Sequence, residues 1–229
     1  MCMKKKGIFS LIAAIGLVAG CATTAPVPEG PEPPQNLLGS TDELQLITEL
    51  SIDLARTYGG DRVMVVLGLE DTLLDTRGDS NASCAGNRQS IHPKQDDAAR
   101  QVQRMQEAGL KVIAMTSRSS DCLDVTLQEL SSNGFDFQAS GYPPGFNFAS
   151  SDGLLSYDQG VFFTTDRGKG PALKQLVESA GKPYPALIVV ADNRQQYLNS
   201  VMKSFSTSAI KVHTWRYARE EKQVASTGN

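Results

Sequence analysis

The sequence is poor in metal-ligating side chains, in basic residues and in long apolar segments. It has two histidines and four cysteines in 229 residues, and His92 and His213 lack the spacing of a metal-binding pair. After the first twenty residues, no stretch approaches the ~20 apolar residues needed to span a bilayer. Loss of Lys4, Lys5 and Lys6 with the leader lowers the basic residues from 22 to 19, against 25 acidic residues. This balance argues against nucleic acid as a partner, because no basic stripe replaces the counterions.

The first twenty residues have the pattern of an export signal. The three lysines precede a short apolar run, Ile8 to Val18, and LVAGC follows at Leu17 to Cys21. This resembles the lipobox of bacterial lipoproteins, in which the cysteine becomes the first residue of the mature chain and carries fatty acids such as palmitate. We predict a signal peptide over 1–20 and lipidation at Cys21. An ordinary signal peptide and an N-terminal membrane helix are the alternatives. Ala22 after the cysteine favours the outer membrane, facing the periplasm.

Residues 21–39 contain APVPEGPEPP and no periodic pattern, so we predict an extended tether that begins at the lipidated cysteine. The folded body is predicted to span 40–229. Its first helix would begin with a capping box formed by Ser40 and Glu43, before Leu44, Ile47 and Leu54 at helical spacing.

Two cysteines remain in the predicted mature body, Cys84 and Cys122. In an oxidising periplasm such a pair can form a disulfide, and we predict this bond. Two separate buried thiols are the alternative, because spacing alone does not define a bridge.

Apolar runs alternate with amphipathic segments along the body. The predicted strands are 63–67, 111–115, 160–163, 186–190 and 209–212, and the predicted later helices are 94–108, 121–133, 170–180 and 193–204. The segment 75–93 is polar and is expected to form a small insertion after the first strand. Continuous apolar strands separated by helices predict an α/β fold with a doubly wound parallel sheet. Ligands bind such sheets at the carboxyl ends of the strands.

Polar residues follow three of these strands, as GLEDT from Gly68, TSR from Thr116 and ADN from Ala191, and DRGKG places Lys169 before a helix. Their order and spacing resemble the haloacid dehalogenase-like (HAD) superfamily, which consists mostly of magnesium-dependent phosphatases with a Rossmannoid fold. The first motif of that superfamily is Asp-x-Asp-x-Thr. A Thr or Ser, a Lys and an acidic cluster form the other three. TSR, GVFFT and KG are similar to a bacterial branch of HAD-like proteins, and the lipid anchor is similar to that of lipoprotein acid phosphatases.

The resemblance implies a role for each matching residue. Glu70 and Asp71 lie in the first motif, Thr116 and Lys169 would bind phosphoryl oxygens, and Asp192 with Glu70 would hold Mg²⁺. Thr116 could instead cap the following helix, Lys169 could be a solvated lysine, and Asp192 could be a helix cap.

Gly68 occupies the position of the attacking aspartate, and Glu70 replaces the second aspartate. An aspartyl-phosphate cannot form without that nucleophile. We therefore expect a lipid-anchored envelope protein with a HAD-like fold and impaired catalysis, a pseudoenzyme that binds a phosphorylated or anionic small ligand or a protein partner. An active Mg²⁺-dependent phosphohydrolase that uses a non-standard carboxylate, such as Asp71, is the alternative; Asp75 follows the Thr-Leu-Leu run and is expected outside the pocket. A purely structural role in the envelope is a third hypothesis.

Overall fold

The computed structural model describes residues 31, 35–76, 91–143 and 145–219. The chain divides into 1–30 and 31–229, and all the described residues belong to the second unit. The predicted signal peptide, Cys21 and Cys84 therefore lie outside the described residues. Among those that are described, no helix is long and apolar enough to cross a membrane.

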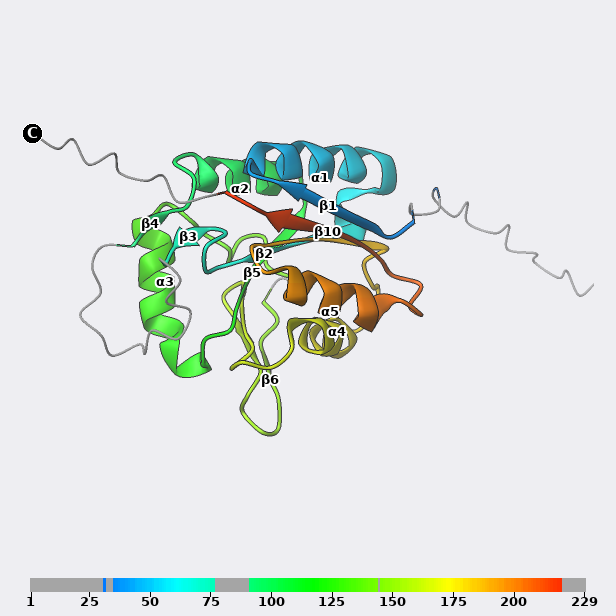
Figure 1. Cartoon of the computed structure of the whole chain (residues 1–229). Coiled ribbons are helices and arrows are strands. Elements are labelled where there is room, and N and C mark those ends of the chain that lie inside the picture. Colours follow the sequence, from blue (N-terminus) through cyan, green and yellow to red (C-terminus); the bar gives the residue numbers. More distant parts are fainter. Residues whose placement is uncertain (1–30, 32–34, 77–90, 144, 220–229) are drawn as a thin grey trace, which may run out of the picture. The chain divides into compact units, whose positions relative to one another are not determined.

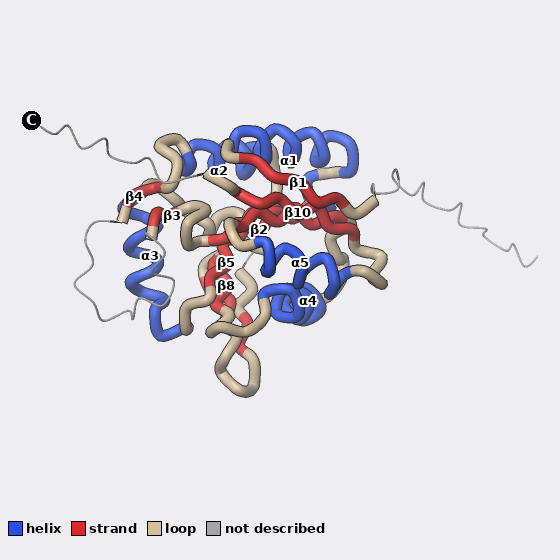
Figure 2. The backbone as a smooth tube through the Cα atoms, in the orientation of Figure 1, coloured by secondary structure: helices blue, strands red, loops and turns tan. Residues whose placement is uncertain are grey.

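A mostly parallel sheet forms the centre of the described unit (Figures 1 and 2). Its strand order is β1 (Leu37–Thr41), β10 (Lys211–Tyr217), β9 (Leu187–Asp192), β2 (Val63–Gly68), β5 (Lys111–Thr116), β8 (Val161–Phe163), β7 (Ser156–Asp158) and β6 (Phe148–Ala149). All neighbours from β1 to β8 run parallel, whereas β7 and β6 are antiparallel additions at one end. The predicted doubly wound α/β fold is confirmed.

Helices cover both faces of the sheet. They are α1 (Leu44–Tyr58), α2 (Ala98–Glu107), α3 (Leu123–Ser132), α4 (Lys169–Ala180) and α5 (Gln195–Phe205), with short 3₁₀ turns at Gly60–Arg62 and Ser120–Cys122. Figure 1 shows α1 and α2 on one side of the sheet and α4 and α5 on the other. Consecutive residues of β2 serve both layers: Val65 packs in the cluster that contains α1 and α2, and Val66 in the cluster that contains α4 and α5. This double burial explains why the strand is apolar without alternation.

The sheet begins earlier in the chain than predicted. Strand β1 starts at Leu37 and pairs with β10, so the predicted tether boundary at residue 39 lies three residues too late. The predicted capping box is also wrong. The Ser40 hydroxyl donates to the Arg216 carbonyl of β10, and the first N–H of α1, that of Leu44, donates to Gln95 Oε1 instead.

Two other regions differ from the sequence prediction. The 75–93 segment begins and ends in a two-stranded antiparallel pair, β3 (Leu74–Asp75) and β4 (His92–Pro93), and residues 77–90 between them lie outside the description. Strand β10 continues to Tyr217, beyond the predicted end at residue 212. Tyr217 is fully buried and donates from its hydroxyl to Gln95 Oε1, which joins β10 to the segment before α2.

Candidate functional site at the carboxyl ends of three strands

Three central strands end side by side in polar residues. Strand β2 lies between β9 and β5, with Leu67 level with Ala191 and Gly68 level with Met115. The strands therefore end together at Gly68, Asp192 and Thr116. The order of the strands therefore brings together the polar residues that the sequence predicted at the carboxyl ends of these strands.

The loop after β2 turns tightly. The N–H groups of Leu73 and Leu74 both donate to the Leu69 carbonyl, at 3.1 and 2.9 Å. Asp71 lies in the left-handed region with φ +54°, and its Oδ1 accepts from the backbone N–H and the hydroxyl of Thr76, at 3.0 and 2.9 Å. The Asp71 carboxylate therefore stabilises the turn, and its hydrogen bonds connect it to none of the other predicted site residues.

Gly68 lies against the carboxylate of the neighbouring strand. A Cβ at this position would lie 2.7 Å from Asp192 Oδ2 and 3.0 Å from Thr72 Oγ1. Both distances are shorter than ordinary van der Waals contact, and both neighbours are almost completely buried. Any side chain at residue 68 would therefore require Asp192 to move.

Asp192 and Lys169 form a buried ion pair. Lys169 Nζ lies 2.7 Å from Asp192 Oδ2, and the two side chains are 6% and 4% exposed. The other oxygen, Oδ1, accepts from the Arg194 N–H ahead of α5 at 2.9 Å. Asp192 is thus both an ion-pair partner and a cap of the turn before α5, while the reading of Lys169 as a solvated lysine is wrong.

Glu70 belongs to a second buried ionic group. Its Oε1 accepts from the Thr116 hydroxyl at 2.6 Å and lies 3.0 Å from Arg118 Nε. Arg118 Nη1 also contacts Glu129 Oε2 on α3, at 2.6 Å, and donates to Thr126 Oγ1 at 2.8 Å. The guanidinium thus connects the loop after β2 to α3. The Thr116 hydroxyl donates to Glu70 and also accepts from the Arg118 N–H at 3.1 Å.

Tyr197 on α5 lies at the mouth of the site. Its ring centroid is 4.7 Å from Lys169 Nζ and 5.5 Å from Arg194 Cζ, within the range of cation–π contact. Its hydroxyl accepts from Arg194 Nη1 at 3.2 Å and from Ser117 Oγ at 3.4 Å. Arg194 and Tyr197 are both partly exposed, and Arg194 forms no ion pair with any described residue. Arg194 is therefore a cation at this edge that an anion from solution could reach without displacing a described carboxylate.

The donor set does not suit Mg²⁺. No group of three or more His, Cys, Asp or Glu side chains in the described part of the chain is arranged to hold a metal ion. Each predicted ligand already has a cationic partner, Lys169 for Asp192 and Arg118 for Glu70. A magnesium ion at these carboxylates would compete with two buried cations for their oxygens.

Sequence reasoning missed Arg118, Glu129 and Tyr197 as parts of this site. Arg118 lies two residues after the predicted Thr116 position and carries a charge just beyond a strand end, which was an available signal. Glu129 lies on α3 at a position that only the tertiary fold brings close. For Tyr197 the sequence offers no signal apart from its place in the helix after ADN.

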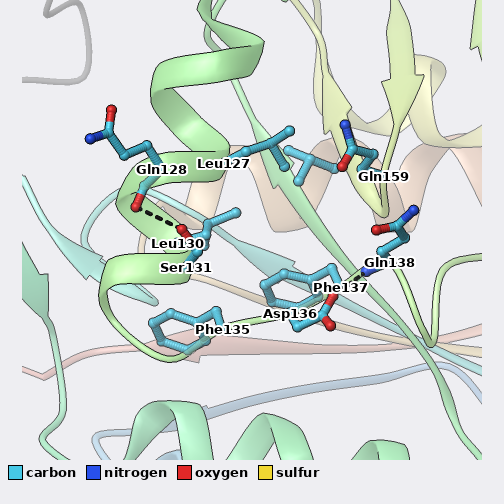
Figure 3. Close-up of a pocket in the computed structure, with 10 residues that line it drawn as sticks. Leu127, Gln128, Leu130, Ser131, Phe135, Asp136, Phe137, Gln138 and Gln159 are labelled. Carbon is cyan, nitrogen blue, oxygen red and sulfur yellow. Dashed lines mark hydrogen bonds between the residues drawn. The ribbon is translucent and has the colours of Figure 1, made fainter.

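A separate cavity of about 380 Å³ lies between α3, the segment after it and β8 (Figure 3). Leu127, Phe137 and Val161 contribute apolar surface, and Gln138 and Gln159 lie together at one side. None of the predicted site residues lines it, and its lining contains no cationic side chain. This cavity is distinct from the strand-end site and does not suit an anion.

Cys122 is buried at the start of α3, and its predicted partner Cys84 lies outside the described residues, so the disulfide stays a prediction.

A family model described as "Protein of unknown function (DUF2608)" matches residues 81–229. This range contains Thr116, Arg118, Lys169 and Asp192, whereas Gly68 and Glu70 precede it. The comparisons with curated proteins and with solved structures found no match.

Proposed function

This chain belongs to the DUF2608 family, and we propose that it is a lipid-anchored envelope protein that binds a small anionic ligand without hydrolysing it. The binding site would be the HAD-like edge formed by the ends of β2, β5 and β9. The single observation that carries the proposal is the closed position at Gly68, where the carboxylate of Asp192 occupies the space beside the missing nucleophile.

Two features support the loss of phosphatase chemistry. Attack on phosphorus needs a carboxylate free to reach it in line. The Asp192 carboxylate is bound to Lys169, and that of Glu70 to Arg118 and Thr116. Because both carboxylates are neutralised by buried cations, neither is poised as a nucleophile or as a general acid.

The mouth of the site supports anion binding. Arg194 offers a guanidinium that no described carboxylate neutralises, and the Tyr197 hydroxyl accepts from it and from the Ser117 hydroxyl. A phosphate or carboxylate could accept from these groups without breaking the buried ion pairs. The ligand would therefore be small and anionic, and it would bind to the exposed groups beside the ends of β2, β5 and β9.

Thermal shift tests this binding. A ligand at ten times its Kd adds about 1.4 kcal/mol to the free energy of unfolding. For a chain of this size that raises Tm by about 3–5 °C. We expect such a shift with inorganic phosphate or one member of a panel of phosphorylated metabolites, and its loss in Arg194→Gln. Arg56→Gln, on the exposed face of α1, is the matched control and should keep the shift. An unchanged shift in Arg194→Gln would remove this residue from the site.

Anchoring rests on the Leu17 to Cys21 pattern and is tested in cells. Labelled fatty acid should attach to the wild-type chain and not to Cys21→Ser. The variant should leave the membrane fraction. A Cys21→Ser chain that stays in that fraction would contradict lipid anchoring and favour one of the alternative leader readings.

A second candidate function is phosphomonoester hydrolysis through a non-standard carboxylate. Asp192 Oδ2 favours it, because it lies 2.7 Å from the place of a Cβ at residue 68. Its attack on phosphorus would form an acyl phosphate and release the alcohol, and water would then cleave the intermediate. Mg²⁺-dependent turnover that is lost in Asp192→Asn but kept in Asp71→Asn would establish this function. Turnover at background in the wild type supports the binding role.

A further inference from the structure

Strand β1 forms an edge of the sheet, beyond β10 (Figure 1). The Thr41 carbonyl accepts from the Ala218 N–H, so the backbone of Thr41 faces β10. Because backbone groups alternate along a strand, Leu37 and Gly39 also face β10, whereas Leu38 and Ser40 face outward. The outward N–H and C=O groups of Leu38 and Ser40 form no hydrogen bond with any described residue.

Within the described residues, the outer edge of β1 carries none of the sequence features that usually protect such strands. Natural edge strands carry lysines, prolines or bulges that prevent pairing with another chain. The sequence of β1 is LLGST, with no charge and no proline, and it pairs with β10 without interruption. Leu37 and Leu38 are 40% and 52% exposed, and they are two of the four large exposed apolar residues in the described part of the chain.

We propose that β1 is a self-association site, where β1 of a second copy pairs antiparallel with it across a two-fold axis at Gly39. Gly39 then faces Gly39 of the other copy, and Leu37 faces Thr41. Leu38 of each copy forms a hydrogen-bonded pair with Ser40 of the other, which satisfies all the outward groups of these residues. The eight-stranded sheets of two copies become continuous.

Three properties of the strand favour a second copy as the occupant. The residues with outward backbone groups, Leu38 and Ser40, are placed symmetrically about Gly39, so one axis satisfies both. The first charged residue after the strand, Asp42, would face the uncharged Asn36 of the other copy, so like charges are not brought together. The side chains of the two Leu38 residues would lie diagonally across the axis, ~7–8 Å apart, within reach of each other.

Gly39 itself suits the axis. Its backbone lies under the ring of Trp215, and a Cβ there would be 2.6 Å from that ring. The glycine pair would be of the narrow, non-hydrogen-bonded type, with Cα atoms ~4.5 Å apart. No side chain at this position obstructs the approach of the two strands.

The register is tested by cysteine crosslinking of the full-length chain in cells. Chains with Leu38→Cys and Ser40→Cys, co-expressed with different tags, should form a mixed disulfide, because hydrogen-bonded pairs have Cα atoms ~5.5 Å apart. Leu38→Cys alone should not crosslink, because its diagonal partner is beyond the ~7 Å limit for a disulfide. Leu46→Cys, on an exposed leucine of α1, is the control partner for Ser40→Cys and should also give no bond.

The association is tested on the full-length chain purified in detergent. Light scattering should give the protein mass of a dimer for the wild type and for Leu46→Lys, and of a monomer for Leu38→Lys. Both variants place a charge on an exposed leucine, so only the edge strand distinguishes them. A monomeric wild type, or crosslinks of Leu38→Cys with itself in place of the mixed pair, would overturn the proposal.

Discussion

Replacing Arg118 by methionine should destabilise the protein more than any other single loss of charge at the candidate site. The guanidinium contacts Glu70 and Glu129 at 3.0 and 2.6 Å. Methionine keeps most of the apolar volume of the side chain and removes only the charge and its donors. Both carboxylates then stay buried without their cation, and Thr126 loses its guanidinium donor.

The expected cost follows from burial. Glu70 and Glu129 have side chains that are 8% and 11% exposed, so water cannot fully replace the guanidinium. Removing one partner of a buried ion pair costs about 3–5 kcal/mol, a large share of the ~5–15 kcal/mol that stabilises a typical domain. The exposed pair of Arg56 and Asp53, with side chains 74% and 70% exposed, provides the contrast. Arg56→Met should cost no more than about 0.5 kcal/mol.

Urea denaturation followed by the fluorescence of Trp215, the single tryptophan, measures both variants. A further variant that combines Arg118→Met with Glu70→Gln and Glu129→Gln removes the two carboxylate charges that the guanidinium contacted, and it should recover most of the lost free energy. If Arg118→Met costs no more than Arg56→Met, the ionic group does not stabilise the fold, and the assignment of Glu70 to a structural role fails.

For three other substitutions the structure predicts the direction of the change in stability. Gly68→Asp should lower Tm and give no phosphatase activity, because its Cβ would lie 2.7 Å from Asp192; an unchanged Tm would show that the position is open. Gly170→Ala should cost about 1–3 kcal/mol, because its Cβ would lie 2.2 Å from a carbonyl of α5; Gly168→Ala, with no contact under 3.6 Å, should be nearly neutral in the same melts. Burial lowers the pKa of His213 below 6.5, so the unfolded chain binds the proton first as pH falls. The resulting loss of Tm between pH 7.5 and 5.5 should be smaller in His213→Gln.

The main strands could be predicted because strands buried on both faces have apolar residues at consecutive positions. Val63 to Leu67 is apolar throughout since both layers of helices pack on it, and its short length and valine content favour a strand over a buried helix. Strand β1 could not be predicted in this way. Its partner β10 lies more than 170 residues later, and the local Ser40–Glu43 pattern favoured a helix start that pairing with β10 overrides.

The candidate site could be predicted in position but not in chemistry. Strand ends meet by topology, so Gly68, Thr116 and Asp192 could be placed together from the order of the strands. Their partners depend on side-chain contacts between distant segments. The bond between Glu70 and Arg118 joins two loops, and Glu129 reaches the group only because α3 packs there. No spacing in the sequence encodes these contacts.

The glycine at residue 68 and the buried ion pair beside it form one unit. With no side chain at Gly68, the Asp192 carboxylate lies close to the backbone of β2 and pairs with Lys169, for which the HAD resemblance predicts a contact to a phosphoryl oxygen. Restoring an aspartate at Gly68 alone would place two carboxylates in one buried space and leave Lys169 to neutralise both. If the proposal is right, an aspartate at Gly68 would therefore restore catalysis only together with a rearrangement of this ion pair. A ligand at this edge, as we propose, would therefore use groups that the buried pairs do not occupy, and among the described residues Arg194 is such a cation.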